Sequence, residues 1–293
     1  MKRLHPRVSI ETLCGLFGNS RQAHHQKQKR LYKQHSEHAV ILEAVRRFRR
    51  GMPRLGSRKL LVKLKEKGID IGRDGLFDLL RENCMLVRRK RVRARTTHSY
   101  HFYKKYPNLV KGLSVDGPEQ VWVSDITYIE TGAGFVYLFL ITDAYSRKIV
   151  GFKTAGTLEA KHAVEALKMA LEGLQGDAAG LIHHSDRGIQ YCCHDYVETL
   201  LGKDIRISMT ENGDPLENAI AERVNGILKV EWIYDRQFKG LPEARAYVKH
   251  IICIYNTQRP HSSIEMLTPQ EAHQRFGELQ RKWKNYYARK GVG

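Results

Sequence analysis

The sequence predicts an α/β protein in which a mixed sheet covered by helices follows a strongly basic, all-α region. Two observations lead to this fold class. Apolar residues recur at helical spacing in the first third of the 293-residue chain, whereas strand-like apolar runs begin at Val121. The positive charge is also divided unevenly, because residues 1–115 hold 29 of the 50 lysines and arginines but only 8 of the 31 acidic residues.

The all-α region is expected to cover residues 1–87. Ser20 is a candidate cap for a basic helix that starts near Arg21, and the pattern recurs with Ser57 and Asp74 as candidate caps of two further helices. Helices joined by short glycine-containing turns are typical of helix-turn-helix DNA-binding regions. A small helical bundle without a DNA role has the same periodicity, so the assignment depends on the charge.

Residues 88–118 are predicted to form a basic linker that lies along the DNA backbone. Its cations repel one another, which favours an extended chain unless a polyanion neutralises them. Concentrated charge of this kind is typical of nucleic-acid-binding modules, and no amphipathic anchor favours an acidic membrane instead. A merely solvated linker is the alternative. The candidate DNA contacts in this run are Arg88, Arg89, Lys90 and Arg91.

The second region, residues 119–275, begins with three strand-like runs in quick succession: VWVSDITYI, FVYLFLITD and RKIVGFKT. A helix, the short strand LIHHS, a helix, a strand and a last helix are expected to follow. This β-β-β-α-β-α-β-α order is that of a ribonuclease-H-like fold, a mixed sheet with helices on both faces. A basic tail, residues 276–293, ends the sequence.

Composition argues against several classes of protein. No apolar run approaches the roughly 20 residues that cross a bilayer, and the first residues do not read as a signal peptide. Five cysteines, two of them adjacent, do not form a disulfide framework, so a reducing bacterial cytoplasm is expected. A GxxxxGK(S/T) loop is missing, which argues against ATP-driven work, and the cysteines lack zinc-site spacing.

Three acidic residues stand out by their context. Asp125 lies in the middle of a strand, where a buried unpaired carboxylate is costly, so we expect a cationic group to meet it. Asp186 follows a strand at its carboxyl end, where α/β sheets commonly place their chemistry. Glu222 lies on a helix for which Asp214 and Pro215 supply start signals. Taken singly, each acid also has an ordinary structural explanation.

Taken together, the three acids point to a metal site. Two Asp residues from strands and a helical Glu supply the carboxylate oxygens that Mg²⁺ or Mn²⁺ prefers. Two such ions roughly 3.5–4 Å apart can activate an attacking oxygen and stabilise a leaving one. These acids are therefore predicted to be both catalytic and metal-ligating. Asn218, Asn225 and Lys229 share the polar helix face of Glu222, within about 60° of one another, and are further candidate DNA contacts.

Several motifs fall in order along the second region: WVSDITY at 122–128, HSDRGIQY at 184–191, PLENA at 215–219 and YNTQRPH at 255–261. Thirty-five residues separate Asp186 from Glu222. These motifs resemble the core of the retroviral-integrase-like transposases, and most of all the second-frame protein (OrfB) of the insertion sequence 3 family with its D,D(35)E signature. The resemblance covers about residues 120–272. Ser124 departs from it, because Thr is common before the first Asp.

The resemblance implies a DNA transposase that works by transesterification. Water attacks a phosphodiester at the element end, and the 3′-OH released attacks another strand. The implied partners are the terminal inverted repeats, target DNA, further copies of the chain assembled on DNA, and a segment from the upstream frame (OrfA) joined by fusion. The resemblance also implies that Tyr255, Arg259 and His261 brace the catalytic helix or touch DNA, although a purely structural role remains open.

Two alternatives stay open beside the transposase. A nuclease of the same fold would stop after hydrolysis, and a strand-transfer assay on a precut end would separate it. A non-catalytic DNA-binding repressor with a decayed second domain is the alternative from another class. The presence of all three acids argues against the repressor.

Overall fold

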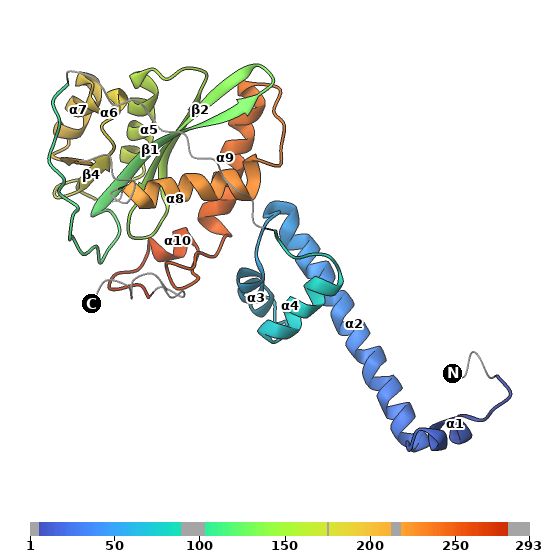
Figure 1. Ribbon diagram of the computed structural model, residues 1–293. Helices are drawn as coiled ribbons and strands as arrows, with labels where there is room; N and C mark the ends of the chain where they lie inside the picture. Colours follow the sequence, from blue (N-terminus) through green and yellow to red (C-terminus); the bar gives the residue numbers. More distant parts are fainter. Residues whose placement is uncertain (1–5, 89–102, 175, 212–217, 281–293) are drawn as a thin grey trace, which may run out of the picture.

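The computed structural model describes residues 6–88, 103–174, 176–211 and 218–280, and all contacts given below lie within them. An N-terminal helical region precedes a five-stranded mixed sheet that helices cover on both faces (Figure 1). The α/β, ribonuclease-H-like fold class predicted from the sequence is therefore confirmed. None of the helices within these residues combines the length and the apolar character needed to span a membrane.

The helical region is dominated by one long helix. In Figure 1, α2 runs away from the sheet, and α1 lies at the end of α2 farthest from it. Ser20 caps α2 as expected, since its side chain accepts a hydrogen bond from the amide of Ala23. Only Ile41 and Val45 of this 31-residue helix are buried, so its first half makes few tertiary contacts. The four helices are α1 (Ile10–Leu16), α2 (Arg21–Gly51), α3 (Ser57–Glu66) and α4 (Arg73–Glu82).

Two of the expected helix caps are wrong. The residues that cap α3 and α4 are Gly56 and Gly72, both with extended backbone and without a capping side chain. Ser57 is instead the first residue of α3, and Asp74 lies in the first turn of α4. The physical reason is that glycine is also accepted at this position, so a polar residue nearby locates a helix start only to within a residue or two.

The sheet has the strand order β3-β2-β1-β4-β5. The first three strands form an antiparallel meander, whereas β4 and β5 run parallel to β1 and to each other. Long apolar runs with tight connections explain the meander, and the helices between the later strands explain the parallel pairs. The bounds are β1 (Val121–Thr131), β2 (Gly134–Asp143), β3 (Ile149–Ala155), β4 (Ile182–Ser185) and β5 (Arg206–Met209).

Alternate residues of β2 enter different cores on the two faces of the sheet. Leu138 and Leu140 join one apolar cluster, and Phe139 and Ile141 join the other. On the second face α5 approaches β3 so closely that a Cβ at Gly151 would lie 2.2 Å from the carbonyl oxygen of Ala166. The first face is covered by α8 (Ala219–Leu228), the π-helix η2 (Lys229–Ile233) and α9 (Leu241–Thr257), and the second by α5 (Ala160–Glu172), α6 (Ile189–Cys192) and α7 (His194–Leu201).

The helical region shares its core with the first face of the sheet. Leu55, Leu60 and Leu76 belong to the same buried cluster as Trp232 and Ile251. Apolar surface of α2, α3 and α4 is thus buried against the segment that follows α8, which draws the two regions together through the hydrophobic effect.

The two segments that flank the core pack onto it where they are described. The amide of Leu109 donates to the hydroxyl of Ser208, so this part of the predicted linker lies against β5. At the other end, the hydroxyl of Tyr145 donates to the carbonyl of Gly277, after the short helix α10 (Pro269–Ala272).

Candidate catalytic site

Asp125 lies on the central strand β1, on the sheet face that α8 covers. One carboxylate oxygen accepts a hydrogen bond of 2.9 Å from the amide of Ile126, and the other accepts one of 2.7 Å from the side chain of Asn225. Burial raises the pKa of the Asp125 carboxyl to about 7, the hydrogen bond from Asn225 opposes this, and the charges of Asp186 and Glu222 add to it. The side chain is therefore held in an environment that resists its negative charge.

The sequence led us to expect a cationic group at Asp125, and this stays a prediction, because the side chain that the structure places at the carboxylate is the amide of Asn225. Within the described ranges, no lysine or arginine forms an ion pair with this carboxylate. Burial lowers the pKa of Lys229, the first residue of η2, and the charge of Asp125 is close enough to oppose this, but the ammonium lies 4.3 Å from the centre of the Tyr128 ring. A neutral amide is a weaker partner for a buried carboxylate than a cation, so the negative charge remains largely uncompensated.

Asp186 follows β4 immediately, and the pairing of β4 with β1 explains its position. Val123 is level with His184 in the parallel register, so continuing the register by two residues sets Asp125 beside Asp186. The amide of Gly188 donates a hydrogen bond of 3.0 Å to the Asp186 carboxylate. A Cβ at Gly188 would lie 2.9 Å from that same oxygen, so the glycine leaves the space that the carboxylate occupies.

Glu222 lies in the first turn of α8 and is exposed. Burial and then the charge of Asp186 raise its pKa. The helix start signals that the sequence offered, Asp214 and Pro215, fall outside the described residues. In the structure Asn218 precedes α8, and its side chain donates to the carbonyl of Ser124 on β1 rather than capping the helix.

The three predicted acids are brought into electrostatic contact but do not converge. The charge of each of the other two raises the pKa of Asp125, which requires the three carboxylates to lie within reach of one another. No group of three His, Cys, Asp or Glu side chains in the described part of the chain is close enough to hold a metal ion. Like charges repel, so a spread arrangement is what three carboxylates adopt by themselves.

The donor set fits a hard divalent cation nevertheless. All three side chains offer carboxylate oxygens, the ligands that Mg²⁺ and Mn²⁺ prefer. The buried side-chain oxygen of Asn225, next to Asp125, also has no hydrogen-bond partner among the described residues. An excess of buried acceptors and negative charge is the environment that a bound cation would relieve.

The other predicted DNA contacts are placed in different surroundings. Asn218 and Asn225 are buried, with exposed fractions of 5% and 4%, and both amide nitrogens donate to β1. Burial lowers the pKa of the Lys229 ammonium, although the charge of Asp125 opposes this. Arg88 is exposed. The remaining three cations of the run, at positions 89, 90 and 91, lie outside the described residues.

Beneath β1 lies a buried polar network that the sequence reasoning missed. Nε2 of His183 is 2.6 Å from the Ser124 hydroxyl and 2.9 Å from the Tyr196 hydroxyl. Burial lowers the pKa of His183 to about 3, so the ring is neutral at ordinary pH. Because Ser124 precedes Asp125, the network fixes the strand on the side opposite α8. The only sequence signal for this network was the hydroxyl of Ser124 directly before Asp125.

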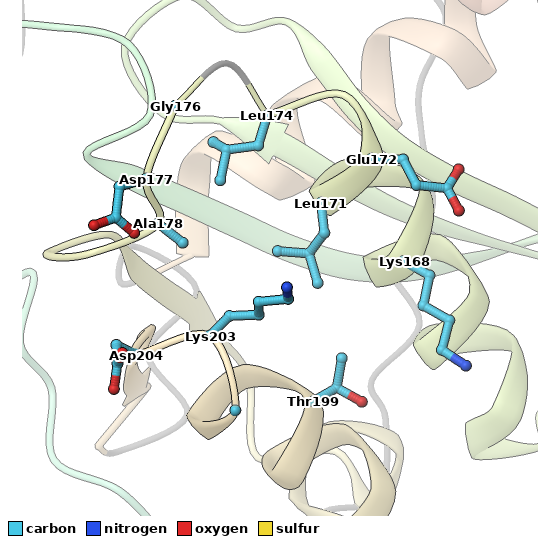
Figure 2. A pocket seen from close by; sticks show the side chains of 11 residues that line it. Lys168, Leu171, Glu172, Leu174, Gly176, Asp177, Ala178, Thr199, Lys203 and Asp204 are labelled. Carbon is cyan, nitrogen blue, oxygen red and sulfur yellow. The ribbon is translucent and has the colours of Figure 1, made fainter.

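A separate hollow of about 640 Å³ lies away from the three acids. Figure 2 shows Lys168 and Glu172 of α5, Thr199 of α7 and Lys203 around it. None of the predicted site residues lines this hollow. The candidate catalytic residues therefore lie outside this hollow, with Asp125 on β1 and Asp186 directly after β4.

Two models of the integrase core domain match the chain, one over residues 115–215 and the other over residues 203–269. The chain is 34% identical over 271 residues to an uncharacterised 31 kDa protein of insertion element IS600 from Shigella sonnei, covering 91% of this chain and 99% of that protein. It is 30% identical over 273 residues to the transposase InsF of insertion sequence IS3A from Escherichia coli strain K12, covering 90% and 93%. The chain belongs to the insertion sequence 3 family of transposases. Membership makes it an integrase-core transposase, a class of enzyme that acts in DNA transposition.

Two solved structures are also similar to this transposase at low sequence identity. One is the integrase catalytic core domain of HTLV-2 in complex with magnesium, with a TM-score of 0.42 and 18% identity over 54% of this chain and 98% of that one. The other is a simian T-cell lymphotropic virus intasome in complex with the PP2A regulatory subunit B56 gamma, with a TM-score of 0.48 and 17% identity over 77% and 75%. The fold assignment itself rests on the strand order.

Proposed function

We propose that this transposase cleaves the ends of its insertion sequence and transfers the cut strand to target DNA, with Asp125, Asp186 and Glu222 as its catalytic and metal-ligating residues. The observation that supports the proposal is the placement of three carboxylates from separate elements: the β1–β4 register sets Asp125 beside Asp186, and Asn225, three residues after Glu222 on α8, donates to Asp125. The charges of Asp186 and Glu222 also raise the pKa of Asp125, so these acids are costly to keep together unless a cation joins them.

The chain's own residues position the reacting groups. When bound, two Mg²⁺ or Mn²⁺ ions would stabilise the attacking and the leaving oxygens of a phosphodiester. Asn225 and the amide of Ile126 orient the carboxylate of Asp125, and the amide of Gly188 orients that of Asp186. Glu222 projects from α8 at an exposed position, where a DNA strand has access to it. Water first frees a 3′-OH at the element end, and that 3′-OH then attacks the target.

The helical region and the basic linker are proposed to bind the element ends. Their excess of positive charge suits phosphate contacts, which supply most of the sequence-independent affinity for DNA. We propose contacts from the run that starts at Arg88, and from Lys229 beside the acids. Asn218 and Asn225 have a different proposed role: their donors already bind β1, so they position its acids. The active form is proposed to contain several copies of the chain.

The test is cleavage of a labelled terminal repeat by single-residue variants. Asp125→Asn, Asp186→Asn and Glu222→Gln should each abolish Mg²⁺-dependent cleavage, because removing one ligand weakens the hold on the cations, while affinity for the DNA stays nearly unchanged. Asp195→Asn is the matched control, since Asp195 is an exposed acid in the first turn of α7. Cleavage that persists in one of the three variants would remove that residue from the site.

The nuclease of the same fold is separated by a second substrate. A precut end carrying a free 3′-OH requires no hydrolysis, so only an enzyme that transfers strands joins it to target DNA. We expect joined product with the wild-type chain and none with Asp186→Asn. Cleavage of intact ends without any joining of precut ends would favour the nuclease instead.

A further inference from the structure

The helix that carries Glu222, which we call the catalytic helix, extends beyond the end of α8. It continues directly into the π-helix η2, and the amide of Tyr234 donates to the carbonyl of Lys229, five residues earlier, at 2.8 Å. A π-turn is rare, occurs mostly as a single turn within an α-helix, and is frequently found at functional sites. Surrounding contacts must therefore stabilise this turn.

The first such contact is a three-residue ion cluster centred on Glu231. Arg259 donates two hydrogen bonds to the Glu231 carboxylate, of 2.7 and 2.6 Å. The ammonium of Lys59, on α3 of the helical region, lies 3.3 Å from the same carboxylate. All three side chains are largely shielded, with exposed fractions of 2% for Arg259, 14% for Glu231 and 18% for Lys59.

Two further contacts tie the same turn to the helical region. The indole of Trp232 donates a hydrogen bond of 2.8 Å to the carbonyl of Gly51, the last residue of α2. Arg54 forms an ion pair of 3.3 Å with Asp235 and also donates to the carbonyl of Arg88, where the basic linker begins. The helical region thus contacts the segment that follows α8 at three residues, Glu231, Trp232 and Asp235.

Burying the three charged side chains of the ion cluster between two surfaces has a cost in desolvation free energy. Burial alone would raise the pKa of Glu231, but Arg259 and Lys59 lower it to about 2. Burial also lowers the pKa of Lys59 to about 8, and the charge of Arg259 adds to this. Apolar residues often replace buried ion pairs without loss of stability, so such clusters are better suited to fixing a register than to adding stability.

α8 is fixed to the sheet at two points, because Asn218 just before the helix and Asn225 in its second half both donate to β1. Glu222 lies between these two bonds, and Asn225 lies between Glu222 and the ion cluster on the same continuous helix. Because Glu222 is on α8 whereas Asp125 is on β1 and Asp186 directly follows β4, the position of α8 decides how closely Glu222 approaches the other two acids. A displacement at η2 would therefore reach Asn225 and its bond to Asp125 first, and then Glu222 one turn earlier on the same hydrogen-bonded helix.

We propose that Lys59, Glu231 and Arg259 are positioning residues that form a joint through which the helical region sets the position of Glu222. DNA bound by the helical region would then favour the arrangement of α8 that cleaves, so end binding and cleavage are coupled. The role given to Glu222 rests on the proposed function, whereas the mechanical link between α3 and α8 does not.

The main test is Lys59→Met in the full chain, which keeps the length of the side chain and leaves Glu231 and Arg259 as a neutral pair. At saturating element-end DNA, single-turnover cleavage should slow by about 10-fold or more, a typical size for coupling between two sites. Affinity for the end should change by less than about 3-fold, since one phosphate contact at most is lost. Lys59→Arg should restore most of the rate.

The matched control is Lys153→Met, which also removes a cation from an ion pair, the pair with Glu165 on the opposite face of the sheet. It should cleave like the wild type. Equal rates for Lys59→Met and the wild type at saturating DNA would overturn the joint. Equal slowing by both lysine variants would overturn it as well, because the effect would then be a general loss of stability.

A second readout does not depend on cleavage. Hydrogen exchange of the α8 amides should be faster in Lys59→Met than in the wild type, with β1 and β2 unchanged, and DNA should slow α8 exchange only when Lys59 is present. Unchanged α8 exchange overturns the proposal. A wild-type chain that cleaves no element-end DNA would defeat the proposed function, and the exchange comparison would still decide the joint.

Discussion

The helical region and the catalytic core use their charged residues in opposite ways. Residues 1–115 carry an excess of 21 positive charges, and the cations of α2 are mostly exposed. The rest of the chain has an excess of 2 negative charges, and its informative charges are shielded, at Asp125 and Glu231. Exposed charge serves long-range attraction to a polyanion, whereas shielded charge serves local geometry and chemistry.

The comparison also divides the long helix α2. Its first half contains exposed apolar residues such as Leu31 and Tyr32, and its buried residues begin at Ile41. Its last residue, Gly51, binds Trp232 of the core. One end of a single helix therefore belongs mechanically to the catalytic core, while the other end projects away from it (Figure 1).

The largest expected effect comes from adding the upstream-frame segment to the chain by fusion. If this segment joins two copies of the chain, paired-end cleavage should rise by about 10²–10⁴-fold, because linked modules act at a high effective concentration. Light scattering with and without end DNA, next to a paired-end cleavage assay, measures this. A stable multimer that transposes efficiently without the segment would show that the segment is dispensable.

The second prediction compares the charges of the two regions. Replacing Arg88, Arg89, Lys90 and Arg91 by Gln should make the log–log salt dependence of end binding shallower by about 3 to 4, since each phosphate contact contributes about −0.9. Affinity at low salt should fall accordingly. Replacing four exposed lysines of the core by Gln should hardly change the slope. Equal slopes for the two quadruple variants would remove the linker from the DNA interface. The four core lysines are Lys161, Lys168, Lys203 and Lys249.

The third prediction uses the pKa of Glu231, which lies at about 2, below its usual value of 4.5. Because the pKa of Glu231 is lower in the folded state than in the unfolded state, its ionised carboxylate stabilises the fold above about pH 4.5. This stabilisation is lost as the pH falls from about 4.5 to about 2. The contribution at neutral pH is about 3 kcal/mol, from about 1.4 kcal/mol per pKa unit. Between these pH values, the free energy of unfolding measured with urea should fall more steeply with decreasing pH for the wild type than for Glu231→Gln. Identical pH profiles would contradict the burial of this ion cluster.

The smallest expected effect concerns Gly188. Gly188→Ala should lower the cleavage rate about 10-fold while stability is nearly unchanged, because the new methyl group crowds the Asp186 carboxylate and the backbone angles suit alanine. Gly226→Ala, on the open side of α8, is the control and should stabilise the helix by about 0.5–1 kcal/mol. Cleavage at the wild-type rate by Gly188→Ala would mean that the carboxylate does not need its observed position.

The sequence predicted the core better than the contacts within it. The strand order follows from apolar runs and their connections, which are local properties of the chain. The two displaced helix starts, at Gly56 and Gly72, show the limit of such local signals. The side-chain partner of Asp125 shows another limit, because the structure places Asn225, a hundred residues away, at that carboxylate. Long-range pairing of this kind leaves no pattern in a single sequence.

By itself, the sequence determined the fold class, the family and the three candidate acids, because periodicity, charge distribution and the 35-residue spacing are written along the chain. Only the tertiary structure decided that α3 reaches the end of the catalytic helix and that Lys59 meets Glu231 there, 172 positions later. The physical reason is that burial changes what a charge does. In the sequence Lys59 is one of many cations, and only the packing of α3 on η2 removes it from water and gives it a single partner.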